Sequence, residues 1–226
     1  MKIKFLNTAA ILAFSVLSMS CNDKGDKADA NEVEEVAVSE DAGAKYAVNA
    51  ADSKIEWKGF KPTGTHNGTV SIETGTFMIE DDNIVSGNFL IDMTTIVSDD
   101  LQGDEKASLE NHLKGTVEGK EGDFFNVKEF PNGAFEVTKS EKMDNGKMMV
   151  SGNLNLKGKK NNITIPVSMS KNGETVTLTS DKFTIDRTKW GVNYGSKSVF
   201  DNLGDKFIND DVELKIMLTA NKAASY

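Results

Sequence analysis

From Tyr46 almost to the C-terminus, apolar residues recur at every second position in one segment after another. Side chains of a β-strand point alternately to two faces, so a period of two predicts strands with one buried face, whereas a helix repeats every 3.6 residues. The alternation is clearest in 76–79, 88–93, 135–137, 150–156, 163–169, 176–178, 183–185 and 212–218. Polar turn residues are expected between the strands at Asp82-Asn83, Asp144–Gly146, Lys160–Asn162 and Lys171–Gly173. The pattern predicts an antiparallel meander.

One segment departs from this period. Between Asp104 and Gly115 the leucines Leu109 and Leu113 lie four residues apart, and Gly115 can end a helix. About eight strands with one short helix and no alternation of strands and helices predict an all-β fold. We expect a closed antiparallel β-barrel, because closure removes exposed strand edges. A two-sheet sandwich is the alternative, since periodicity does not separate the two.

The first residues have the pattern of an export signal. Lys2 and Lys4 precede an apolar stretch, 5–19, that is shorter than the roughly 20 residues of a membrane-spanning helix. The string Leu17–Cys21 is similar to a bacterial lipobox, with leucine one place further from the cysteine than usual. We therefore expect residues 1–20 to be a lipoprotein signal peptide and Cys21 to carry acyl chains such as palmitate. An ordinary signal peptide and an uncleaved anchor are the alternatives.

The segment after the cysteine is acidic. Residues 22–45 contain eight acidic residues, three lysines and no aromatic residue. Such a composition does not bury enough apolar surface to order itself, so it predicts a flexible tether over 21–45, about 25–30 Å in span. The folded domain is expected over 46–226.

Charge and residue types exclude several functions. The net charge is −9, and Arg187 is the single arginine, which argues against nucleic-acid binding. Cys21 is the only cysteine, so the chain has no internal disulfide and no four-cysteine zinc site. The histidines His66 and His112 lack partners at ligand spacing, which argues against a metal site. No Gly-x-Ser-x-Gly elbow and no phosphate loop occur. We expect Asp186 and Arg187 to be a structural ion pair or strand-end anchor.

Six motifs in a fixed order resemble the YceI-like family. They extend from Tyr46 to about Ala220. The first motif joins Tyr46–Asn49 to Ser53–Gly59, the second is His66–Gly68 and the third is Gly87–Asp92. The fourth joins Leu109 and His112-Leu113 to Asp123–Pro131, the fifth runs from Gly152–Gly158 through Val167, and the sixth is Phe183–Gly191.

The resemblance implies a lipocalin-like barrel whose apolar channel binds a polyisoprenoid or an isoprenoid quinone, for sequestration or transport, without enzymatic activity and without a cofactor. With the signal sequence, it leads us to expect a membrane-anchored lipoprotein of the cell envelope, in the outer membrane facing the periplasm, with surface exposure as the alternative. Protein partners are left open. Two other functions compete: an envelope interaction or stress protein with a side-chain-filled barrel, and an enzyme that uses His66 or His112 as acid or base.

The alternation also predicts which residues face the channel. The inward set is Phe77, Phe89, Ile91, Phe135, Leu154, Leu156, Ile165, Val167, Phe183 and Ile185. Loss of Lys2 and Lys4 with the signal peptide leaves a charge of −11, of which residues 22–45 carry −5, so the domain carries −6. We therefore expect a neutral or weakly polar isoprenoid in preference to a diphosphate, although Lys157, Lys159 and Lys160 form a local cluster that could offset this field.

Overall fold

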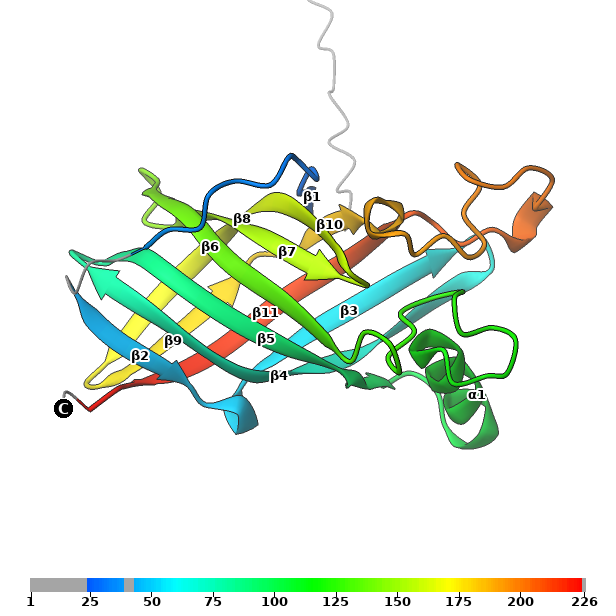
Figure 1. Cartoon of the computed structure of the whole chain (residues 1–226), viewed down its shortest axis with the longest axis horizontal. Helices are drawn as coiled ribbons and strands as arrows, with labels where there is room; N and C mark the ends of the chain where they lie inside the picture. The colour runs from blue at the N-terminus through cyan, green and yellow to red at the C-terminus, as the bar shows by residue number, and fades with distance from the viewer. Residues whose placement is uncertain (1–23, 39–42, 225–226) are drawn as a thin grey trace, which may run out of the picture.

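Consecutive antiparallel strands wind into a ring that the last strand closes (Figure 1). The computed structural model describes residues 24–38 and 43–224. The ring consists of β3 (Lys54–Lys61), β4 (Gly64–Glu80), β5 (Asn83–Ser98), β6 (Asn132–Lys142), β7 (Met148–Leu156), β8 (Lys159–Asn172), β9 (Thr175–Ser180) and β11 (Asp211–Lys222). Because β11 pairs with β3 on one side and β9 on the other, the sheet is a closed barrel, and the sandwich alternative is wrong.

Three shorter strands extend the ring. β2 (Ala44–Val48) joins β4 to the far half of β11, and β10 (Phe183–Asp186) pairs with the near half of β11. β1 (Asp26–Lys27) adds to β10 in parallel. The 3₁₀-helices are η1 (Ala50–Asp52), η2 (Arg187–Trp190) and η3 (Gly204–Lys206).

The predicted helix is present as α1 (Gly103–Lys114) and lies at one end of the barrel (Figure 1). Gly115 ends it in the left-handed conformation, with φ 70°, and its amide bonds back to the carbonyls of the last turn. The expected turn at Lys160–Asn162 is wrong, because these residues belong to β8 and Asn162 is buried. The β7–β8 turn lies instead at Lys157 and Gly158, which both have positive φ.

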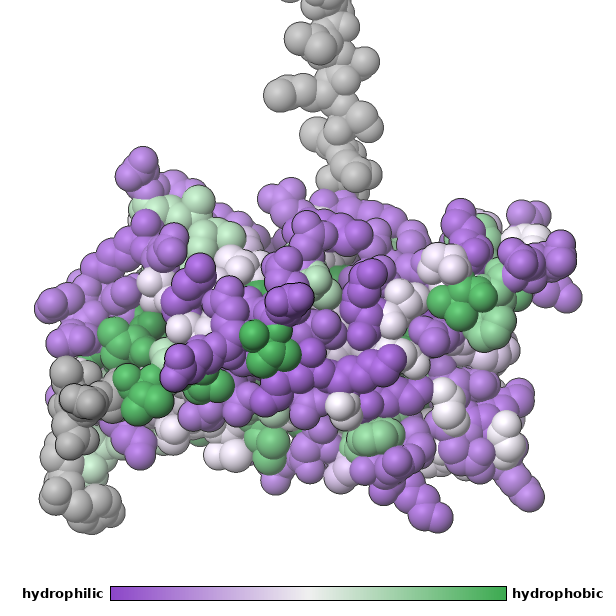
Figure 2. Space-filling model, turned by 45° about the horizontal axis from the view of Figure 1, so that its top comes forward, coloured by the Kyte–Doolittle hydropathy of each residue, from purple (hydrophilic) through white to green (hydrophobic). Residues whose placement is uncertain are grey.

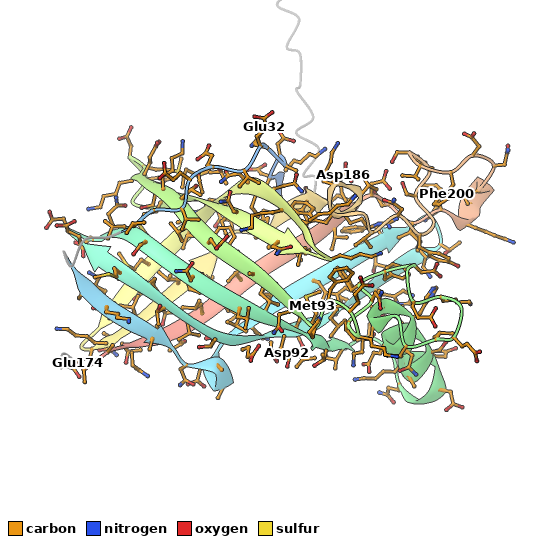
Figure 3. The ribbon with its side chains drawn as sticks, viewed as in Figure 1. Glu32, Asp92, Met93, Glu174, Asp186 and Phe200 are labelled. Carbon is orange, nitrogen blue, oxygen red and sulfur yellow. The ribbon has the colours of Figure 1, made fainter. Side chains whose placement is uncertain are left out.

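The segment expected to be a flexible tether is ordered over residues 24–38 and runs along the outside of the barrel; we call it the N-terminal strap. Ala28 N donates to Thr184 O at 2.8 Å, and Asn31 exchanges two backbone hydrogen bonds with Asn162. The strap lies along the top of the barrel in Figure 3, where Glu32 is labelled.

Backbone hydrogen bonds hold the strap, which explains why its composition misled the prediction. Glu34 N donates to Asn153 Oδ1 at 3.1 Å, and Asn153 Nδ2 donates to Glu34 O at 2.7 Å. Asn162 Nδ2 donates to the same Asn153 oxygen. Both asparagines are buried beneath the strap although they lie on the outer face of their strands. The signal peptide and Cys21 lie outside the described residues.

Candidate ligand-binding channel

The interior of the barrel divides into a packed end and a hollow part. At the packed end, where β2 and the C-terminus lie, six buried residues do not line the interior cavity, although Phe77 also borders a polar hollow beside β2: Tyr46, Phe77, Ile79, Met148, Val176 and Ala220. Tyr46 stacks on Phe77 at 5.6 Å between ring centroids. Phe77 is only 1% exposed, and its ring lies 6.0 Å from that of Phe89, which lines the cavity.

The barrel encloses a cavity of about 270 Å³, whose wall extends from Ile84 and Leu218 beside the packed end to α1. One water molecule needs roughly 10–15 Å³ on this measure, so the space far exceeds the water or two that a side-chain-filled barrel would leave. Strands from every side of the ring contribute apolar side chains, and α1 adds Leu109 and Leu113. We call this space the channel.

Nine of the ten residues predicted to face the channel line it, namely Phe89, Ile91, Phe135, Leu154, Leu156, Ile165, Val167, Phe183 and Ile185. Phe77 points inward as predicted but belongs to the packed end. That these residues contact a lipid stays a prediction. The period of two placed them correctly because the pleat sends every second side chain of a ring strand to the interior.

Small residues give the aromatic rings of the wall their space. A Cβ at Gly152 would lie 2.3 Å from the ring of Phe135, and one at Gly75 would lie 2.7 Å from Phe89. The absence of a side chain at each glycine therefore leaves room for the aromatic ring of a phenylalanine to lie across a neighbouring strand. The two rings are 6.4 Å apart and form adjoining parts of the channel wall.

Sequence reasoning missed the part of the wall contributed by irregular segments. Trp57, Phe124, Trp190, Val192 and Ile208 line the channel, and all but Trp57 lie outside the long alternating strands. Trp190 is fully buried, and its Nε1 donates to Leu154 O at 2.9 Å. Trp57 also alternates with Ile55 on β3, so the same period could have identified it.

At the end that carries α1, aromatic side chains join three segments. His112 of α1 lies edge-on to Phe124 at 5.0 Å and to Tyr194 at 4.7 Å, and its Nε2 is 2.7 Å from Asp123 Oδ2. Phe124 and Tyr194 are 5.4 Å apart. These contacts tie the helix and the segment after it to the loop 191–210.

Three charged or titratable groups of the channel wall lie towards the α1 end. They are Lys61, His66 and Arg187. His66 Nδ1 is 2.9 Å from Asp100 Oδ2. Burial raises the pKa of Asp100, but hydrogen bonds from the amide of Asn67 and the side chains of His66 and Ser98 outweigh it and lower that pKa to about 2. An ionised Asp100 only accepts hydrogen bonds, so Nδ1 of His66 carries the proton.

Arg187 is the strand-end anchor that the sequence predicted. It is buried, and its guanidinium donates to the carbonyls of Val192, Ile208 and Asn209 at 2.6, 3.1 and 3.1 Å. Asp210 lies 3.8 Å away, whereas Asp186 caps η2 by accepting from Thr188 N. Burial lowers the pKa of Arg187, and the two aspartates oppose that shift. The arginine thus holds both ends of the loop 191–210 together.

The predicted lysine cluster is largely occupied by protein partners. Lys157 Nζ donates to Gly122 O at 2.6 Å, and burial lowers its pKa. Lys160 Nζ is 2.5 Å from Glu136 Oε2. Lys159, the first residue of β8, is exposed and does not line the channel. Within the described ranges, 24–38 and 43–224, no group of three or more His, Cys, Asp and Glu residues is placed to hold a metal ion.

The model of the YceI-like domain matches residues 46–220 of this chain. The protein belongs to the YceI-like family. No curated protein sequence matches the chain. Among solved structures, BcnA of Burkholderia cenocepacia is 23% identical with a TM-score of 0.59, over 77% of this chain and 99% of that chain.

A second similar structure is a polyisoprenoid-binding domain from Saccharophagus degradans, implicated in plant cell wall breakdown. It is 12% identical with a TM-score of 0.56, over 84% of this chain and 100% of that domain. At these identities the likeness concerns the fold, and it agrees with the closed barrel described above. The YceI-like family is not known for enzymatic activity. Among residues 24–38 and 43–224, no helix has the length and apolar character needed to cross a bilayer.

Proposed function

We propose that this protein is a cell-envelope lipoprotein that binds a long apolar isoprenoid-type lipid, a polyisoprenoid or an isoprenoid quinone, for sequestration or transport. The observation that carries the proposal is the channel of about 270 Å³ with apolar walls on every side. Removing apolar surface from water stabilises a bound chain by about 25 cal/mol per Å². The similar fold of the polyisoprenoid-binding domain from Saccharophagus degradans supports this class of ligand.

The electrostatics of the wall favour a neutral or weakly polar head group. Arg187 uses three donors on backbone carbonyls, and Lys157 and Lys160 are occupied. A diphosphate would have to be held by the cations that remain, Lys61 and Lys159, against a domain charge of −6. Burying two or more negative charges without paired cations is strongly unfavourable. We therefore expect the head group of the ligand, at the α1 end, to be an alcohol, a phenol or a quinone.

Acylation of Cys21 would place the barrel at a membrane, and we propose the outer membrane facing the periplasm. The lipobox-like string before the cysteine supports anchoring at a membrane. Two acyl chains or more are needed for stable anchoring, because a single chain gives only marginal, reversible binding. A native mass spectrum of the protein purified from membranes reports acylation and bound lipid together. We expect a mass increase at Cys21 and a co-purified isoprenoid.

A substitution in the channel wall tests the binding proposal. Phe89→Asp introduces a charge where a lipid chain would lie, and we expect it to abolish lipid retention measured by extraction and mass spectrometry. Lys139→Glu changes the charge at an exposed position of β6 and serves as the matched control, with retention unchanged. Equal retention in the two variants would contradict the assignment of the channel.

A second variant covers the case in which Phe89→Asp does not fold. Ile91→Phe adds bulk to the same wall without a charge, so the barrel stays apolar while the space for a chain shrinks. We expect reduced retention with little change in the unfolding midpoint. Extraction of chiefly isoprenyl diphosphate from the wild type would overturn the preference for a neutral head group, and extraction of no lipid would overturn the proposed function.

A further inference from the structure

The loop 191–210, with the 3₁₀-helix η3, projects from the α1 end of the barrel and exposes large apolar side chains. Tyr194 is 40% exposed, Val199 47% and Phe200 49%. Phe200 lies near the extreme end of the molecule in Figure 3. Three more large hydrophobics are exposed in the described residues, Val33 and Val38 of the strap and Met143 of the β6–β7 turn. Half of the exposed set therefore falls in this one loop.

The structure holds the loop in place. Arg187 bonds to carbonyls at both of its ends, and Ile208 N donates to Gly195 O at 2.7 Å across it. Phe200 N donates to Ser196 O at 2.9 Å. Exposure of Val199 and Phe200 is thus a property of an ordered turn. A pair of adjacent apolar side chains on an ordered projection is suited to insertion into an apolar phase.

Lysines surround the base of the loop. Lys197 Nζ lies 4.2 Å from the ring of Phe207, and Lys24 Nζ lies 4.3 Å from the ring of Phe60 on β3. Phe60 O accepts from Asn209 N at 2.8 Å, so β3 and the loop are direct neighbours. The loop also contains three aspartates, Asp201, Asp205 and Asp210, against Lys197 and Lys206, so its own charge is −1. The loop therefore has no net attraction to anionic lipid head groups, and the apolar pair supplies the affinity.

The start of the described chain lies on the side of the barrel next to Phe60, which is a neighbour of the loop. Lys24 follows Cys21 by three residues, which reach about 10 Å when fully extended. An anchor at Cys21 would consequently enter a bilayer close to Phe60 and the loop. Phe60, Val192 and Ile208 also line the channel, so the loop and the channel wall meet at one end of the barrel, and the Lys24 side chain reaches Phe60 from the side where β1 pairs with β10. Figure 2 shows a hydrophobic patch beside the loop at this end of the surface.

We propose that the loop 191–210 docks on the lipid bilayer, with Val199 and Phe200 inserted among the acyl chains and Lys197 and Lys206 at the head groups. The α1 end of the channel then faces the membrane, and a lipid passes between bilayer and channel without crossing water. This goes beyond the proposed function and depends on it only for the nature of the cargo.

Vesicle binding by the unacylated chain tests the proposal. The mature chain with Cys21→Ser is mixed with vesicles of phosphatidylethanolamine and phosphatidylglycerol, and the bound fraction is measured by flotation. We expect Val199→Ser with Phe200→Ser to lower the partition coefficient at least about tenfold, because two buried apolar side chains are lost. Met143→Ser, at an exposed apolar position of the opposite end, is the matched control and should leave binding unchanged.

A fluorescent reporter locates the contact. With Phe200→Trp, emission should shift to the blue and be quenched by brominated lipids when vesicles are added, whereas Met143→Trp should show neither change. Equal binding of the loop variant and the wild type, or quenching at both tryptophans, would overturn the proposal. A concentration-dependent dimer that Phe200→Ser abolishes, without vesicle binding, would assign the loop to a second copy of the chain instead.

The lipid content of the same variants separates this proposal from the proposed function. The loop variant should bind as much lipid at equilibrium as the wild type, because the channel wall is intact, but should take lipid up from vesicles more slowly. A wild type that docks on vesicles yet never carries lipid would refute the proposed function and leave the docking surface standing.

Discussion

The two ends of the barrel are built from the same alternating strands, yet one is filled and the other is hollow. At the packed end, Tyr46 stacks on Phe77, and Phe77 and Val176 are almost completely buried without lining the channel. Towards α1 the inward residues are equally apolar, but the ring is covered by a helix and a loop that do not fill it. Inward-facing apolar residues alone therefore do not decide between core and cavity.

Truncating one phenylalanine from each part gives the largest expected contrast. Phe77→Ala should lower the free energy of unfolding by about 3–5 kcal/mol, because it leaves a void in tightly packed surroundings. Phe89→Ala should cost only about 1–2 kcal/mol, since its ring already borders empty space. Denaturant unfolding of the lipid-free proteins measures both. An equal loss of unfolding free energy in the two variants would mean that the barrel rearranges in solution and closes the cavity.

Arg187→Met should loosen the α1 end selectively. It removes the donors to the carbonyls of Val192, Ile208 and Asn209, and we expect a loss of about 2–3 kcal/mol. Hydrogen exchange should accelerate at amides of 191–210 and stay slow at the packed end. Asp186→Asn, which keeps a capping oxygen for Thr188, is the control with a smaller effect. Uniform acceleration along the chain would show that the two ends unfold together.

The smallest effect concerns pH. The pKa of Asp100 is about 2 in the folded protein against 3.8 ordinarily, so the ionised form stabilises the fold. That stabilisation is fully present above about pH 4 and is lost as the pH falls towards 2. Allowing for solvent screening, we expect about 1 kcal/mol. Comparison of unfolding midpoints with Asp100→Asn across this range should show a smaller pH dependence in the variant; an unchanged slope would contradict the assignment.

The sequence predicted the barrel and most of its interior, because strand alternation is a local property that survives folding. It identified nine of the residues that line the channel and the helix that ends at Gly115. It did not separate Phe77 from Phe89, since both alternate in the same way and differ only in what lies across the ring.

The strap was missed for a different reason. Its acidic, apolar-poor composition predicts a free chain, but its backbone hydrogen-bonds to the side chain of Asn153 and to the backbone of Asn162, two outward residues. Pairing of this kind between segments far apart in the sequence leaves no periodic signal in either segment. The only sequence signal of a strap-binding surface is a set of polar residues at outward positions of neighbouring strands, and the same pattern is typical of a surface that faces water.

The position of β11 has a consequence for the order in which the molecule is made. β3 to β9 can pair with their neighbours in sequence as soon as each hairpin exists, but the ring stays open until β11 joins β3 to β9. Because synthesis begins at the N-terminus, the growing chain has no enclosed interior until its last strand, β11, has been made and has paired. The channel therefore comes into being in the last pairing step, and a truncation that removes β11 would leave an open sheet with no enclosed binding space.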